Sequence, residues 1–186
     1  MKAKPNQRPG EVVLEINRGD EAMMAAANVP VAASPFRICH ILVPVDFSDC
    51  AKKALQYAIP LAKEHEAALT LLYVVPPIYT VGEYGGMEYP QLQAEMQASG
   101  HKALEKLNET EVRGEVPTEL VVRLGAPANE IIEAARTLES DLIVVSTHGR
   151  TGLKHLLLGS VAEHVVRRAP CPVLIVRERE HEFLVP

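Results

Sequence analysis

The sequence predicts an α/β protein built on a doubly wound, five-stranded parallel sheet. Five short apolar segments recur along the chain, and stretches with apolar residues at helical spacing alternate with them. The segments are apolar at nearly every position, which is typical of parallel strands that helices cover on both faces. The 186 residues are enough for one ordinary domain of this class.

The folded part begins with a strand, a turn and a helix. The near-continuous apolar run 38–43 predicts the strand, with Pro44 at its end. Ser48 or Asp49 can cap a helix that reaches about Glu64, because alanine and leucine recur there at helical spacing.

The same pattern then repeats to the end of the domain. Glycines and prolines fill a long loop after the second strand, and Pro127 suits the first position of a helix. Ser160 and Glu163 have the spacing of a capping box, which predicts the start of the last helix. The further predicted strands are 68–75, 119–124, 142–145 and 172–176, and the further helices are about 90–108, one from Pro127, and about 160–168.

The chain divides into three parts. Residues 1–36 hold several prolines and glycines and one strand-like stretch, 12–16, so we expect a mobile N-terminal extension. Residues 37–178 carry all five predicted strands and form the domain. Residues 179–186 are expected to be a C-terminal tail.

Composition and charge exclude several classes of protein. The net charge of -5 repels phosphate backbones and anionic lipids, and 4% aromatic residues without tryptophan leave little for base stacking. No apolar stretch is long enough to span a bilayer. Cys39, Cys50 and Cys171 are odd in number and far apart, which argues against a disulfide framework. We therefore expect a cytoplasmic protein that binds neither nucleic acids nor membranes.

Asp46 is the first candidate ligand-binding residue. Parallel sheets of this type bind ligands outside the carboxyl ends of their strands, and Asp46 comes directly after the first strand. Its carboxylate can accept hydrogen bonds from a ribose or a base. The alternative is that Asp46 only helps to cap the helix that follows.

The loop after the fourth strand is the second candidate. Glycines such as Gly149 and Gly159 let a backbone approach a phosphate, and Arg150 adds positive charge. The amides of Gly159, Ser160 and Val161 at a helix start can donate to an anion. An N-cap role for Ser160 explains that residue without any ligand.

The chain resembles the universal stress protein family over residues 38–177. The likeness runs through 41–48, 73–75, 147–152 and 169–176. Nucleotide-binding members of that family carry the motif G-x2-G-x9-G-[ST]. Gly149, nine further residues, Gly159 and Ser160 match its second half, whereas Ser146 stands where the motif has its first glycine.

The resemblance implies an adenine-nucleotide pocket. In it, Asp46 meets the ribose or base, Val74 lies beside the adenine, and the glycine loop holds the phosphates. Ser146 places a side chain where the ribose or α-phosphate would pass, and its hydroxyl can also donate a hydrogen bond. The residues predicted to bind the nucleotide are Pro44, Val45, Asp46, Val74, Ser146, Gly149, Arg150, Gly159, Ser160 and Val161.

The predicted function is that of an ATP-binding sensor or regulator that acts as a homodimer. ATP is expected alone or with Mg²⁺ or Mn²⁺, and the histidines lack the spacing of a protein metal site. No catalytic base is evident, so slow ATP hydrolysis stays an open alternative. The last strand, Val173, Leu174, Ile175 and Val176, should lie at a sheet edge where a second copy can pair, as the resemblance also implies. The other alternative is a dimeric interaction module that binds no nucleotide.

Overall fold

The computed structural model describes residues 2–5, 12–15, 37–77, 80–82, 85–87, 90–149 and 158–178. The chain separates into two compact units, residues 1–36 and 37–186. In the first unit, β1 (Lys2–Pro5) pairs antiparallel with β2 (Val12–Glu15). The sequence predicted β2 and missed β1, because lysine, alanine and proline are poor strand residues and carry no strand signal of their own.

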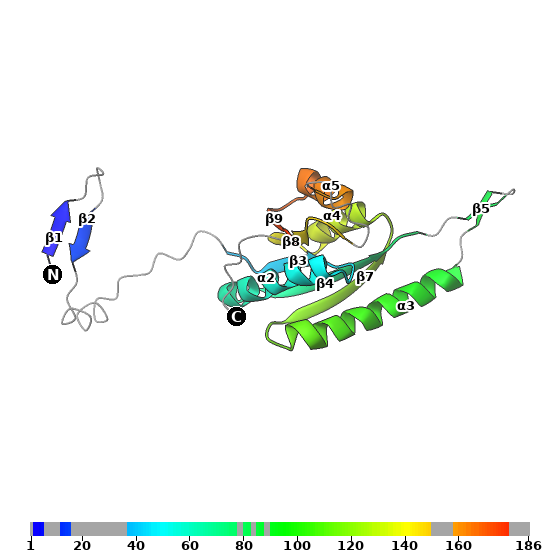
Figure 1. The fold of residues 1–186 in the computed structure, drawn as a ribbon, viewed down its shortest axis with the longest axis horizontal. Helices are drawn as coiled ribbons and strands as arrows, with labels where there is room; N and C mark the ends of the chain where they lie inside the picture. The colour runs from blue at the N-terminus through cyan, green and yellow to red at the C-terminus, as the bar shows by residue number, and fades with distance from the viewer. Residues whose placement is uncertain are drawn as a thin grey trace. The chain divides into compact units, whose positions relative to one another are not determined.

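The second unit is built on a five-stranded parallel sheet (Figure 1). The strand order is β7-β4-β3-β8-β9, so the chain winds outward from the central strand on one side, returns, and winds outward on the other. The predicted fold class, a doubly wound parallel sheet, is confirmed. The strands are β3 (His40–Pro44), β4 (Ala68–Val75), β7 (Thr118–Leu124), β8 (Leu142–Ser146) and β9 (Val173–Val176).

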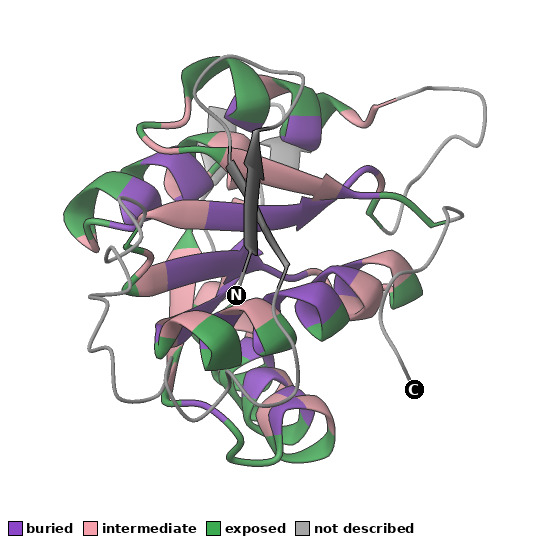
Figure 2. Cartoon of the chain, turned by 90° about the vertical axis from the view of Figure 1, so that its left-hand side faces the viewer, coloured by how far each residue is buried: buried purple, intermediate pink, exposed green. Residues whose placement is uncertain are grey.

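Helices cover both faces of this sheet. Along β3, Ile41 and Val43 face the cluster that α2 and α3 complete, whereas Leu42 faces the cluster that includes α4 and α5, and all three are fully buried. Figure 2 shows the same pattern, with buried strands between helices whose outer sides are exposed. This double burial explains the unbroken apolar runs of the sequence. The helices are α2 (Asp49–His65), α3 (Pro90–Leu107), α4 (Pro127–Thr137) and α5 (Ser160–Arg168).

The first strand of the sheet begins two residues later than predicted, at His40 rather than Ile38. The reason is a carboxylate on the neighbouring chain segment. The amides of Cys39 and His40 donate to Asp141 Oδ2, at 2.8 and 2.9 Å. At the start of β3, these two amides therefore bond to the Asp141 side chain and not to a neighbouring strand.

The long loop after β4 contains two short strands that the sequence did not predict. β5 (Thr80–Gly82) pairs antiparallel with β6 (Gly85–Met87). Their glycines signal a loop, and only the pairing between the two segments makes them strands. Further along, α3 ends one residue before the predicted boundary and continues as a π-helical turn, η1 (Asn108–Val112).

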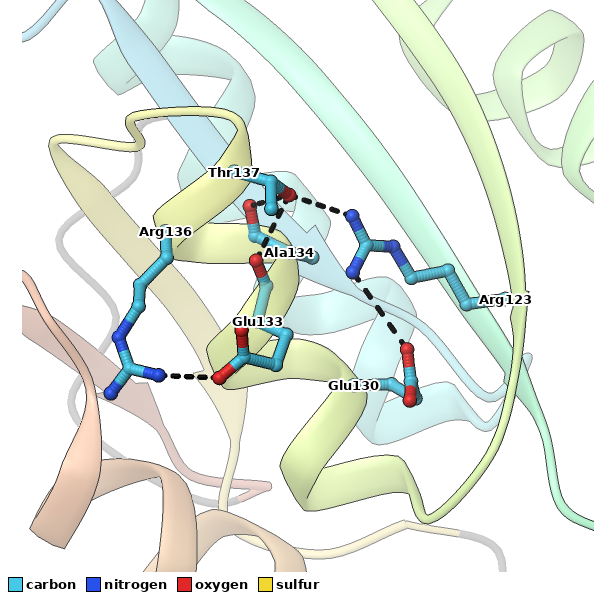
Figure 3. A network of polar contacts seen from close by, with 6 residues as sticks. All are labelled: Arg123, Glu130, Glu133, Ala134, Arg136 and Thr137. Atoms are coloured by element: carbon cyan, nitrogen blue, oxygen red, sulfur yellow. Dashed lines mark hydrogen bonds and ion pairs between the residues drawn. The ribbon is translucent and has the colours of Figure 1, made fainter.

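A polar network fixes the turn that connects β7 to α4 (Figure 3). Arg123 Nη2 donates to Thr137 Oγ1 at 2.7 Å, and Arg123 Nη1 lies 3.7 Å from Glu130 Oε2. Gly125 in this turn has a φ of 153°, a backbone conformation that residues with a side chain rarely adopt, so the turn favours glycine. Strand end, turn and helix are thereby held together, which sets the position of α4. Among the described residues, no helix combines the length and apolarity needed to cross a membrane.

Candidate functional site

A cleft of about 510 Å³ opens outside the carboxyl ends of β4, β3 and β8. The winding of the sheet reverses between β3 and β8, which is where open α/β sheets bind ligands. Arg150, the tenth residue predicted to bind the nucleotide, lies outside the described residues. The other nine line this one cleft: Pro44, Val45, Asp46, Val74, Ser146, Gly149, Gly159, Ser160 and Val161.

Asp46 lies half-buried at the end of β3, with each carboxylate oxygen facing a different neighbour. Oδ1 accepts hydrogen bonds from the backbone amide of Ser48 at 3.1 Å and from Ser48 Oγ at 2.6 Å. Ser48 Oγ in turn accepts from the amide of Ala51 at 3.2 Å, so Ser48 is the N-cap of α2. Asp46 therefore supports the cap through Ser48 and is not itself the cap.

The second oxygen of Asp46 faces the glycine loop. A Cβ added to Gly149 would lie 2.4 Å from Asp46 Oδ2, a separation that real Cβ atoms essentially never show. The backbone of the loop thus approaches the carboxylate more closely than any other residue would allow. The structure brings together two site residues that are far apart in the sequence and that were predicted independently.

The start of α5 is joined to the end of β8. The amide of Gly159 donates to the carbonyl of Thr147 at 2.8 Å, and the carbonyl of Gly159 accepts from the amide of Glu163 at 2.9 Å. Gly159 is therefore the N-cap, and the capping box predicted from Ser160 is wrong by one position. Because Ser160 is the first helical residue, the amides of Ser160, Val161 and Ala162 have no partner within the helix.

Ser146, the departure from the family motif, lies at the end of β8 and is 8% exposed. Its Oγ donates to the carbonyl of His148 at 2.8 Å, so the hydroxyl is bonded to its own loop. His148 Nδ1 lies 3.0 Å from Thr147 Oγ1.

Two cysteines of the domain, Cys50 and Cys171, lie in surroundings that disfavour the thiolate. Burial raises the pKa of the Cys50 thiol, and Glu178, Asp46 and Asp49 raise it further. Burial, followed by the charge of Asp141, likewise raises the pKa of Cys171. A raised pKa leaves less thiolate at neutral pH and hence a weaker nucleophile. Within the described residues, no group of three or more His, Cys, Asp or Glu side chains is arranged to hold a metal ion.

Several lining residues were not predicted. Met96 reaches the cleft from α3, and Pro127 and Ile131 reach it from α4. Pro127 had a usable signal, since it follows the end of a parallel strand, but its role as a helix starter explained it fully. Met96 had no such signal, because its position within α3 does not show which strand end the residue lies near. Tyr73 and Thr147 also line the cleft.

Fold and site together define a class: a doubly wound parallel α/β protein with a ligand cleft at its topological switch point. A glycine loop and a helix start border that cleft. The chain belongs to the universal stress protein family, whose family model matches residues 38–177.

Individual relatives agree with this assignment. The universal stress protein MJ0531 of Methanocaldococcus jannaschii is 38% identical over 142 residues, which cover 76% of this chain and 84% of that protein. The solved structure of UspA from Lactobacillus plantarum superimposes with a TM-score of 0.66 at 29% identity, over 76% of this chain and 99% of that one. A universal stress protein solved in complex with cAMP has a TM-score of 0.56 at 26% identity, over 77% and 100% of the two chains.

Proposed function

We propose that this protein binds an adenine nucleotide, ATP above all, in the cleft and acts as a nucleotide-dependent sensor in the stress response. The observation that carries the proposal is the convergence of nine predicted residues, from three strand ends and one helix start, on a single cleft. The related protein in complex with cAMP supports a ligand built of adenine, ribose and phosphate.

The order of the strands gives the ligand a direction. β4, β3 and β8 are neighbours, so their ends lie about 10 Å apart from first to last. Val74 offers an apolar surface for the base at the end of β4, and Asp46 offers a hydrogen-bond acceptor for the ribose at the end of β3. The phosphates then fall at β8 and α5, where helix amides and the positive end of the helix dipole favour an anion.

The residues present fit such a ligand. Gly149 and Gly159 keep the phosphate side narrow and lined by backbone, since a Cβ at Gly159 would lie 3.0 Å from the carbonyl of Thr147. The Ser146 hydroxyl is bonded to His148 and leaves only a small side chain at the wall of the cleft. We therefore propose that Ser146 is compatible with the nucleotide. Any Mg²⁺ or Mn²⁺ would bind the phosphate oxygens of ATP.

Binding without rapid turnover is the role we propose. Asp46, the one carboxylate among the lining residues that the structure describes, already accepts two hydrogen bonds from Ser48 at one of its oxygens. That leaves it better suited to hold a hydroxyl than to take up a proton from a water molecule. The bound nucleotide would act by favouring one conformation or assembly of the protein. The cytoplasmic location stays a prediction from the cysteine pattern.

Calorimetric titration of the full chain with ATP, AMP and cAMP tests the nucleotide proposal. We expect ATP to saturate the protein with a dissociation constant in the micromolar range, about −8 kcal/mol. Saturation by AMP or cAMP with flat injections of ATP would reject ATP as the preferred ligand. Flat injections of all three nucleotides at millimolar concentration would reject the nucleotide function. The alternative, a dimeric interaction module that binds no nucleotide, would then be favoured.

We further propose that two copies pair through β9. This strand ends the order of the sheet, so one of its sides has no neighbour among the described strands. The carbonyl of Pro172 accepts from the amide of Ile143 in β8, and the carbonyl of Val176 accepts from the amide of Thr147, directly after β8. In a parallel ladder the intervening Val173 and Ile175 then direct their amides outward. An outward row of amides can pair with a second chain.

Replacing Ile175 with proline is expected to convert the proposed dimer to monomer, because proline removes an outward amide without touching a bond to β8. Sedimentation velocity at micromolar concentration measures the effect. Ile175→Ala is the matched control, since it trims the side chain and keeps the amide, and it should remain dimeric. A wild-type protein that sediments only as a monomer contradicts the dimer.

A further inference from the structure

Phe47, between Asp46 and Ser48, has an unusual backbone conformation. Its φ of 65° lies in the left-handed region, which a bulky aromatic residue rarely enters. Such strain persists only where surrounding contacts hold it, and it concentrates at binding sites. This conformation was not predicted from the sequence, since phenylalanine is not a residue that signals a left-handed turn.

Packing on the α3 side of the sheet holds Phe47 in place. Its ring centroid lies 4.8 Å from that of Tyr73 on β4, at an interplanar angle of 48°, a geometry in which aromatic rings attract. Tyr73 is in turn pressed against α3, because a Cβ at Gly100 would lie 2.5 Å from Tyr73 Cδ1. The absence of a side chain at Gly100 thus makes room for the tyrosine ring that contacts Phe47. Both rings also pack against the core cluster of α2 and α3.

The turn at Phe47 sets the direction of the Asp46 carboxylate. The left-handed residue brings Ser48 back toward Asp46, so that Oδ1 receives both the amide and the hydroxyl of Ser48. Oδ2 then lies on the side of Gly149, and both residues line the cleft. A carboxylate held at one oxygen in this way has little freedom to turn away.

We propose that Phe47 is a positioning residue that locks the Asp46 carboxylate so that it accepts hydrogen bonds from the ribose hydroxyls of the nucleotide. Tyr73 and Gly100 keep Phe47 in its left-handed conformation. This inference rests on the proposed nucleotide function. It attributes the selectivity of the cleft for the sugar to the ring pair of Phe47 and Tyr73. Ribonucleotides are the class of ligand that such a lock favours over nucleotides that lack ribose hydroxyls.

The test compares ATP with 2′,3′-dideoxy-ATP, which lacks both ribose hydroxyls. The wild type should bind ATP at least about tenfold more tightly, as expected when hydrogen bonds to a charged group are lost. Asp46→Ala should abolish this preference. Phe47→Ala should reduce it to about the level of Asp46→Ala, and Phe47→Tyr, which retains a ring, should restore it.

A double-mutant cycle separates positioning from plain stability. If Phe47 acts through Asp46, the Asp46→Ala, Phe47→Ala double variant has the same sugar preference as Asp46→Ala alone. Tyr73→Leu changes no residue of the turn but removes the ring that supports Phe47, so it should lower the preference in the same direction. This variant tests the proposal if Phe47→Ala fails to fold. Melting temperatures of all variants show whether a loss of preference follows a loss of folding.

The outcomes distinguish a failure of the positioning role from a failure of the proposed nucleotide function. A wild type that binds no nucleotide rejects the proposed function. A wild type that binds ATP and dideoxy-ATP equally rejects the ribose contact of Asp46 and the inference with it. A wild type that prefers ATP, together with Phe47→Ala and Tyr73→Leu variants that keep the full preference, overturns the positioning role alone.

Discussion

Gly149→Ala is expected to weaken ATP binding about 100-fold, the loss that follows when a charged hydrogen-bonding group is displaced from its ligand. A methyl group at this position would lie 2.4 Å from Asp46 Oδ2, so either the carboxylate or the loop must move. Either movement damages the cleft, because Asp46 and the loop both line it. Calorimetric titration of the variant with ATP measures the loss.

The control removes the carboxylate that the methyl group meets. In an Asp46→Ala background, Gly149→Ala should cost almost nothing further in affinity, since the two substitutions act on one contact. For the same reason, Gly149→Ala should lower the melting temperature less in the Asp46→Ala background than in the wild type. A Gly149→Ala protein that binds ATP as tightly as the wild type would show that the close approach of loop and carboxylate does not matter for binding.

Leu42→Ala is expected to lower the free energy of unfolding by about 2–5 kcal/mol, the range for truncating a buried leucine. Leu42 is 0% exposed on the central strand and packs in the cluster beneath the cleft, with Leu72 and Ile143. The loss combines the transfer of the side chain with the cavity left behind. Urea unfolding measures it, and the melting temperature should fall by about 5–20 °C.

Leu92→Ala is the matched control for this prediction. Leu92 is 43% exposed on α3, so its truncation should change the free energy of unfolding by less than about 0.5 kcal/mol. Similar losses for the two leucines would contradict the double-sided burial of β3. If the folded Leu42→Ala protein binds ATP as tightly as the wild type, the substitution affects only the stability of the fold.

Local signals were enough to predict the architecture. The second strand of the sheet has the predicted bounds, Ala68–Val75, because an apolar run that ends at two prolines is visible without any partner. α2 begins after Ser48, one of the two predicted caps, and α4 begins at Pro127. Capping residues and prolines at the first helical position interact with residues a few positions away, so a local stretch of sequence is enough to predict them. The edge position of the last strand followed from winding rules.

The composition of the candidate site could be predicted for a related reason. In a parallel sheet, residues directly after strands meet at one edge whatever the details of packing. Asp46, Ser146 and Gly149 therefore reach one cleft. The resemblance to a family added Val74 and the roles of the individual residues. Met96 escaped because nothing in α3 itself states which strand end the helix overhangs.

The sequence by itself thus determined the class of fold, the order of its elements and the edge at which a ligand would bind. Only the tertiary structure decided the N-cap of α5 at Gly159, the approach of Gly149 to Asp46 and the left-handed turn at Phe47. Each of these depends on a partner distant in the chain: the carbonyl of Thr147, the carboxylate that follows β3, or the ring of Tyr73. Such contacts exist only once the strands are side by side, so no local pattern of residues records them.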